Sequence, residues 1–97
     1  MKPILACLMF LSPVSSVWAA TAAYHCTDGT AVRASFSAPG PAGSVRLAFS
    51  GQRSSITLPQ VPSADGGRYQ DGTVEFWIKG KTAQLTRAGV TTECRTP

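Results

Sequence analysis

The stretch DGTVEFWIKGKTAQLTRAG, residues 71–89, alternates apolar and polar side chains along two short runs. The apolar positions of these runs are Val74, Phe76, Ile78, Ala83 and Leu85. Because successive side chains of a strand point to opposite faces, a period of two is typical of a strand with one buried face. Turn-forming residues bound the runs at 71–72, at Gly80 and at 88–89. The stretch therefore predicts two antiparallel strands joined by a tight turn.

The same alternation recurs on the N-terminal side of this stretch. It covers residues 32–36, 45–49 and 56–58, and turn-forming residues separate the runs at 28–29, 39–41 and 50–52. Beyond residue 19, no helical period is sustained without Gly, Pro or β-branched interruptions. We therefore predict an all-β domain of seven or eight short strands. Closure into a small antiparallel barrel would hide the strand edges, and a β-sandwich is the alternative.

The N-terminal residues have the three-part composition of an export signal. A basic residue, Lys2, precedes a short apolar run, and the small residues that follow end with Ala19. We predict a signal peptide over 1–19, cleaved after Ala19, and a mature domain over 20–97 that is periplasmic or secreted. The apolar run is shorter than the roughly 20 residues that a transmembrane helix needs. Little apolar sequence precedes Cys7, so we expect no lipid anchor there and no other membrane anchor.

The mature chain keeps two cysteines, Cys26 near its start and Cys94 near its end. In an exported protein an even number of cysteines favours a disulfide, because the compartment is oxidising. This bond would close almost the whole domain into one loop and stabilise it by about 4 kcal/mol in the chain-entropy model. Such a staple suits a domain too small to depend on its core alone. A pair of buried, unpaired thiols is the alternative.

Charge and composition argue against several classes of function. Without Lys2 the chain carries eight Lys and Arg against five Asp and Glu, a net charge of +3. The basic residues are spread singly, so we expect no nucleic-acid partner. His25 is the single histidine and lies next to Cys26, whose thiol the disulfide would consume. No ligand spacing matches a metal site. Asp65 and Asp71 could be imagined as a pair of catalytic acids, but Asp71-Gly72 is first of all a hairpin turn signal. We expect neither an enzyme nor a cofactor.

Two connections are long enough to carry function, 38–44 and 59–67. The second has two prolines at its start and two glycines near its end, and Arg68 and Tyr69 follow. Proline restricts the backbone and glycine allows unusual turns, so we interpret 59–67 as a rigid, protruding loop. A loop already held in its bound shape loses less entropy on binding. An ordinary long hairpin connection is the alternative.

Trp77 and Lys79 occupy the face of their strand opposite Phe76 and Ile78. If the apolar pair faces the core, the indole and the ammonium lie together on the outside. That combination suits recognition of a partner. The alternative is that Trp77 covers a small satellite core and Lys79 is a solvated hairpin residue.

Three spaced motifs cover the mature domain from end to end. They are Ser63-Ala64-Asp65-Gly66-Gly67-Arg68-Tyr69, Phe76-Trp77-Ile78-Lys79-Gly80 followed by Ala83 and Leu85, and Tyr24-x-Cys26-x-Asp28-Gly29 with the distant Cys94. In this order they resemble the signature of the bacterial inhibitors of c-type lysozyme, the MliC/PliC family. The resemblance implies an eight-stranded antiparallel barrel, export to the envelope, and a c-type lysozyme as protein partner. We expect a monomer or a weak homodimer.

The resemblance also implies which residues meet the lysozyme. In the family, a loop serine and the lysine of the Phe-Trp-x-Lys-Gly strand enter the cleft and engage the two catalytic carboxylates, and this lysine corresponds to Lys79. The implied contact residues are Ser63, Asp65, Gly66, Gly67, Arg68, Tyr69, Trp77 and Lys79. The sequence departs from the family at Asp65, which stands where the family has serine.

A carboxylate close to two others is repelled unless one of them is protonated. Our hypothesis is that Asp65 accepts a hydrogen bond from the protonated glutamic acid of the lysozyme, while Lys79 and Arg68 offset the remaining charge. Two alternatives are that Ser63 takes over the role of the serine and that the target preference differs.

Two other classes of function compete with inhibition. The barrel could be a non-inhibitory module that binds a glycan or an envelope protein, or a structural domain whose arginines face anionic lipid or polysaccharide. The net charge also matters, because a chain of +3 gains no long-range attraction toward a strongly basic lysozyme. A less basic lysozyme is therefore the partner that charge favours.

Overall fold

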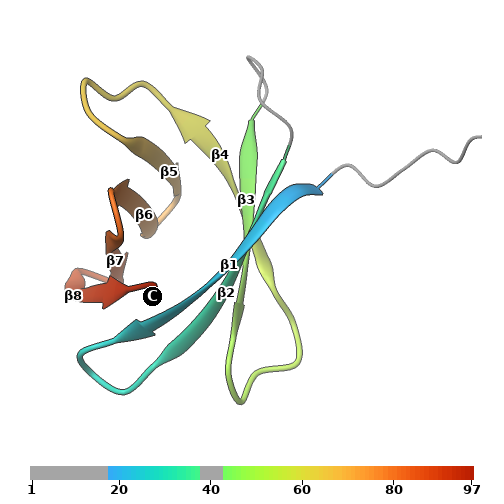
Figure 1. Ribbon diagram of the computed structural model, residues 1–97, viewed down its shortest axis with the longest axis vertical. Coiled ribbons are helices and arrows are strands. Elements are labelled where there is room, and N and C mark those ends of the chain that lie inside the picture. Colours follow the sequence, from blue (N-terminus) through green and yellow to red (C-terminus); the bar gives the residue numbers. More distant parts are fainter. Residues whose placement is uncertain (1–17, 38–42) are drawn as a thin grey trace, which may run out of the picture.

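The computed structural model describes residues 18–37 and 43–97, which form a closed antiparallel barrel of eight strands (Figure 1). The strands are β1 (Trp18–Cys26), β2 (Ala31–Ser37), β3 (Ser44–Phe49), β4 (Ile56–Val61), β5 (Gly67–Asp71), β6 (Val74–Lys79), β7 (Thr82–Arg87) and β8 (Val90–Arg95). Each strand pairs with its neighbours in chain order, and β1 closes the barrel against β8. The prediction of an all-β barrel is confirmed, and the sandwich alternative is wrong.

Parts of the predicted organisation lie outside the described residues. These parts are Cys7, most of the predicted connection 38–44, and the predicted signal peptide 1–19 except its last two residues, which begin β1. Among the residues that the structure describes, no helix has the length and apolar character needed to cross a bilayer.

The interior of the barrel is filled by the apolar side chains that the period-two pattern assigns to one face. The buried set is Tyr24, Cys26, Val32, Ala34, Val45, Leu47, Phe49, Leu58, Phe76, Ala83, Leu85 and Cys94. Phe76 is the largest fully buried side chain, and Tyr24 meets it edge to face with ring centroids 5.2 Å apart. Aromatic pairs favour this geometry. Burial raises the pKa of Tyr24.

The seam between β1 and β8 is short and carries the disulfide. Its recorded register consists of two pairs, His25 with Arg95 and Cys26 with Cys94, and the second pair is bonded through its sulfur atoms. The prediction that this bond ties the first strand to the last is therefore confirmed. A covalent link at a two-pair seam supports closure where the hydrogen-bonded ladder is short.

The connection predicted over 59–67 is shorter in the structure, and the prediction was wrong about its bounds. β4 continues to Val61 and pairs with β3 through Pro59, while β5 begins at Gly67. The β4–β5 ladder has two recorded pairs, which start beside Pro59 at Gln60. Proline has no N–H to donate, so it is compatible with a strand where a ladder ends. The connection that remains is residues 62–66, which we call the Asp65 loop.

Candidate functional site

The Asp65 loop lies at one end of the barrel, between β4 and β5 (Figure 1). Its backbone is fixed around Asp65 by three hydrogen bonds. The Ser63 hydroxyl donates to the carbonyl oxygen of Asp65 at 2.6 Å and accepts from its amide at 3.1 Å. The indole Nε1 of Trp77 donates to the same carbonyl at 2.8 Å. Because these bonds use only the backbone of Asp65, its exposed carboxylate is left to project from a held loop.

Gly66 brings the loop into direct contact with β6. Its φ of 69° lies in the left-handed region, and a Cβ there would overlap the carbonyl oxygen of Ile78. Only glycine meets both demands without strain. The following Gly67 has an ordinary φ, and an added Cβ would come within 3.3 Å of the Tyr69 ring. Gly66 therefore permits the close approach of the loop to β6, and Gly67 leaves room for Tyr69.

Trp77 lies between the two cationic side chains of the predicted site. Arg68 is its partner in the β5–β6 register, with the guanidinium carbon 4.9 Å from the indole centroid. The ammonium of Lys79, two residues further along β6, lies 4.3 Å from the same ring. Cation–π contacts at exposed sites contribute about 0.5–1 kcal/mol each. Trp77 thus touches the loop through its N–H and both cations through its ring.

The two cations differ in how their charge is compensated. Arg68 forms an ion pair with Glu75, which lies two residues before Trp77 on β6. Lys79 is exposed and forms no ion pair with any residue that the structure describes. Its position is fixed at the start of the β6–β7 hairpin, where the hydroxyl of Thr82 donates to its carbonyl oxygen at 3.0 Å. Lys79 is therefore the cation of this site that remains available to a partner.

Tyr69 points away from this surface. Its ring packs against Phe36 with centroids 5.8 Å apart, beside the core, and burial raises its pKa. The ring therefore supports the β5 backbone from the core side, and the role of Tyr69 as a contact residue stays a prediction.

The structure brings together seven of the eight residues implied by the resemblance and places Tyr69 beneath them. Sequence reasoning missed Glu75 as the partner of Arg68 and the indole N–H as the clamp on Asp65. The pairing of Arg68 with Trp77 could have been predicted from the sequence. The tight turn at 71–72 pairs Asp71 with Val74, and counting three residues back along β5 and three forward along β6 reaches Arg68 and Trp77.

Other candidate chemistry does not assemble. Asp65 precedes β5 and Asp71 is the last residue of that strand, which spans about 13 Å at 3.3 Å per residue and keeps the two carboxylates apart. His25 is exposed on β1 and makes no hydrogen bond or ion pair within the described chain. Among the residues described, no three His, Cys, Asp or Glu side chains gather as they would to hold a metal ion.

Comparison with known proteins supplies the context for this geometry. The family model described as membrane-bound lysozyme-inhibitor of c-type lysozyme matches residues 24–93. A curated relative from Yersinia enterocolitica, named membrane-bound lysozyme inhibitor of C-type lysozyme, is 44% identical over 43 residues; the match spans 44% of this chain and 35% of that protein. Among solved structures, Pseudomonas aeruginosa MliC in complex with hen egg white lysozyme superposes with a TM-score of 0.69 and 21% identity, over 96% of this chain and 99% of that one. At this identity the match shows a shared fold.

Proposed function

The chain belongs to the family of membrane-bound lysozyme inhibitors of c-type lysozyme, and we propose that it blocks such an enzyme by placing the Asp65 loop and Lys79 in the active-site cleft. One observation carries this proposal: an exposed carboxylate and an exposed ammonium project from elements that are fixed to the same indole, Trp77. A partner would meet both groups at once, in a spacing that the barrel sets beforehand. Such preorganisation lowers the entropy lost on binding.

The chemistry of the target explains why these groups would bind there. The cleft of a c-type lysozyme holds one carboxylic acid that stays protonated near neutral pH and one carboxylate that stays ionised. The ammonium of Lys79 complements the ionised group. Inhibition then requires no reaction, because the loop occupies the space where the sugar would bind. We propose no enzymatic activity for the chain itself.

Asp65 gives the proposal its pH dependence. Its carboxylate would accept a hydrogen bond from the protonated glutamic acid, and Lys79 would offset the charge that remains. Arg68 contributes less than the sequence suggested, because Glu75 already neutralises its guanidinium. When the pH rises and the glutamic acid ionises, Asp65 faces a like charge and binding weakens. We expect tighter inhibition at pH 5 than at pH 8.

Ser63 is the less favoured substitute for the family serine. Its hydroxyl already donates to and accepts from the backbone of Asp65. Using it for the lysozyme would break the bonds that hold the loop in shape. Replacing Asp65 with serine should therefore flatten the pH profile of inhibition between pH 5 and 8, and an unchanged profile would contradict the role given to Asp65.

The decisive experiment compares two lysines of one hairpin. Lys79→Ala should weaken inhibition of cell-wall lysis by about tenfold or more, since it removes a charge-assisted contact. Lys81→Ala removes the same charge from an exposed position on the far side of Gly80 and should change inhibition less than twofold. The assay uses the mature protein with several c-type lysozymes, and g-type and i-type enzymes serve as controls. Equal inhibition by the two variants would exclude insertion of Lys79, and no inhibition of any c-type enzyme would exclude the function.

The names of the family and of the Yersinia relative both include membrane-bound, which agrees with a place in the bacterial envelope. We propose export by the signal peptide 1–19 and release into the periplasm or medium after cleavage at Ala19. A lipid on Cys7 is the competing form. The intact mass of the protein from cells distinguishes them, because a lipoprotein would begin at Cys7 and carry acyl chains.

A further inference from the structure

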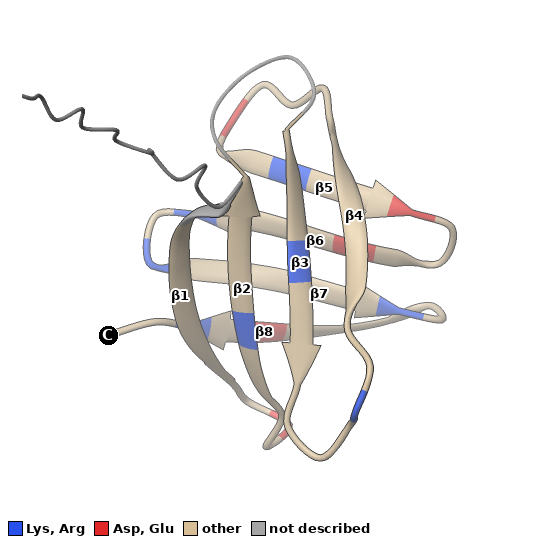
Figure 2. Ribbon diagram, turned by 90° about the vertical axis from the view of Figure 1, so that its right-hand side faces the viewer, with Lys and Arg blue, Asp and Glu red and all other residues tan. Residues whose placement is uncertain are grey.

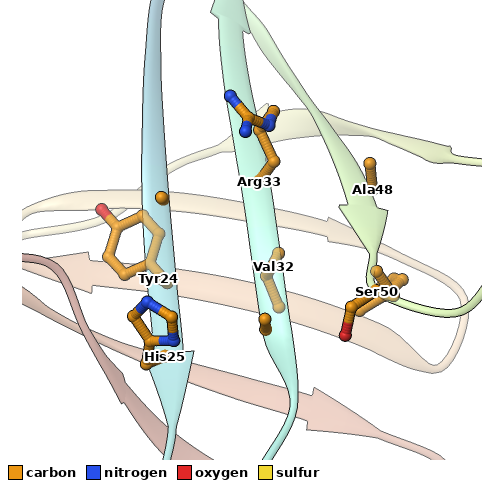
Figure 3. Close-up of a pocket in the computed structure, with 9 residues that line it drawn as sticks. Tyr24, His25, Val32, Arg33, Ala48 and Ser50 are labelled. Carbon is orange, nitrogen blue, oxygen red and sulfur yellow. The ribbon is translucent and has the colours of Figure 1, made fainter.

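A hollow of about 480 Å³ lies on the outer surface of the β1–β3 sheet (Figure 3). The outward-facing residues that line it are Ala23, His25, Ala31, Arg33, Ala48 and Ser50, and we call it the β1–β3 groove. It lies where β1 and β3 end and β2 begins. The Asp65 loop follows the end of β4, which runs antiparallel to β3, so the loop and the groove lie at opposite ends of these strands.

Arg33 stands on the middle strand at one edge of the groove and has no partner among the described residues. The register places it between Ala23 on β1 and Ala48 on β3. Both neighbours end at a methyl group, so neither can accept a hydrogen bond from the guanidinium. Within the described chain, Arg33 and His25 form no hydrogen bond, ion pair or ring contact. Two donors thus border a floor of small side chains.

The surroundings supply no counter-charge on these strands. None of the described residues of β1–β4 is Asp or Glu, and Figure 2 shows blue but no red on the upright strands. Asp28, in the β1–β2 turn, accepts a hydrogen bond from the Thr30 amide at 2.9 Å. On β8, Arg95 lies opposite His25 and adds a further cation beside the groove. The charge of the groove therefore complements an anion.

The shape of the groove narrows the class of anion. Its volume falls within the roughly 300–1,000 Å³ of small-molecule sites. An alanine floor offers a flat apolar surface on which a sugar ring can pack, and a guanidinium binds a carboxylate through two parallel hydrogen bonds. A membrane surface fits less well, because interfacial binding requires large apolar side chains. In the described chain the large hydrophobic residue that is exposed is Val90, at the start of β8.

We propose that the β1–β3 groove binds a carboxylate-bearing saccharide, with Arg33 on the carboxylate, the methyl groups of Ala23 and Ala48 beneath the sugar ring, and His25 as a second donor. This site is independent of lysozyme inhibition. Because it lies at the opposite end from the Asp65 loop, an acidic glycan and a lysozyme could be bound at the same time. The protein would then be retained on an acidic polysaccharide while its loop stays free.

The test uses a hyaluronan tetrasaccharide, which carries glucuronate carboxylates, and neutral chitotetraose as the matched ligand without charge. Amide chemical shifts of the ¹⁵N-labelled mature protein should move at 23–25, 31–33 and 48–50 with the first ligand and stay in place with the second. Arg33→Gln should weaken binding by about tenfold or more. Arg53→Gln removes the same charge from the exposed β3–β4 connection and should change it less than twofold.

Four results would overturn the proposal. They are equal binding of chitotetraose, equal losses from Arg33→Gln and Arg53→Gln, shifts that gather at 62–66, and absence of binding at 10 mM of the charged tetrasaccharide. Vesicles that contain phosphatidylglycerol test an anionic lipid as the alternative ligand. If the protein binds them and Arg33→Gln weakens this binding about tenfold, the proposal is also overturned. Lysozyme inhibition by Arg33→Gln should equal that of the unchanged protein, so failure of this proposal leaves the inhibitory one intact.

Discussion

Trp77→Phe separates the two tasks assigned to the indole. The substitution deletes the Nε1 donor that holds the Asp65 carbonyl at 2.8 Å and keeps an aromatic ring beneath Arg68 and Lys79. One hydrogen bond of this kind stabilises the folded loop by about 1 kcal/mol net. The population of the binding-competent loop then falls, and the apparent affinity falls with it. Since 1.4 kcal/mol corresponds to a factor of ten, we expect lysozyme binding to weaken by up to about fivefold.

Surface-immobilised c-type lysozyme gives both rate constants. The loss should be mainly in the dissociation rate, as it is for most changes within one interface. Hydrogen exchange supplies a readout that needs no lysozyme: the Asp65 amide, which donates to Ser63, should exchange faster in Trp77→Phe. The urea midpoint should change little, because Trp77 lies on the outer face of β6 and the core is unaltered.

A matched variant on β7 shows whether the effect belongs to the indole N–H. Gln84→Ala alters the β7 side chain that faces Trp77 in the β6–β7 register and leaves the indole N–H in place. Its affinity and its Asp65 exchange should equal those of the unchanged protein. If Trp77→Phe binds lysozyme as tightly as the unchanged protein and the Asp65 amide exchanges no faster, the indole does not hold the loop. A global loss of stability equal to the loss in binding would mean that the effect is on the fold.

Three further predictions concern the loop, the staple and the first turn. Gly66→Ala, which must move the loop away from Ile78, should weaken lysozyme binding at least tenfold, whereas Gly67→Ala needs only a small shift of the Tyr69 ring and should cause a smaller loss in the same binding assay. Replacing Cys26 and Cys94 by serine should lower the free energy of unfolding by about 4 kcal/mol, measured by urea titration against the oxidised protein. Hydrogen bonds from Thr30, with a smaller effect of Arg87, hold the pKa of Asp28 below its ordinary value of 3.8. The ionised Asp28 therefore stabilises the fold above about pH 4, and this stabilisation disappears as the pH falls through the lower pKa of the folded state. The urea midpoint should accordingly rise less between about pH 2 and pH 6 in Asp28→Asn than in the unchanged protein.

The fold could be predicted from sequence because one signal dominates it. Alternation with a period of two assigns Phe76 and Leu85 to the interior. Tight turns bring each strand beside the next one in the chain, so that consecutive strands pair. A predicted export signal, whose removal would leave two cysteines, predicts the bond between Cys26 and Cys94 that the structure contains. These inferences need only local pattern and chain order.

The bounds of the Asp65 loop could not be predicted in the same way. Pro59 resembles a loop residue by composition, yet it lies in β4 and pairs with Ser44 on β3. The β4–β5 ladder begins only at Gln60, so the missing N–H of Pro59 costs no recorded pair with β5. β5 itself shows no clean alternation, because Gly67 and Arg68 are set by contacts with Tyr69 and Trp77. Such contacts depend on the path of the chain in three dimensions and leave no period in the sequence.

The net charge of the chain does not describe the charge near the Asp65 loop, because the charged residues are unevenly distributed. Around the Asp65 loop, Arg68 is neutralised by Glu75, and the carboxylate of Asp65 balances the ammonium of Lys79. Positive charge away from the loop lies on β2, on β3 and in the β3–β4 connection, at Arg33, Arg46 and Arg53, and Lys81 adds an exposed charge in the β6–β7 turn beside Lys79 (Figure 2). At physiological salt, charges farther apart than about 8 Å are largely screened. A basic lysozyme that approaches the loop therefore meets a surface on which, of the described residues, Lys81 is the one charge beside the site without a counterpart among Asp65, Arg68, Glu75 and Lys79. The fit of the two preset groups, more than the net charge, then decides whether the lysozyme stays bound.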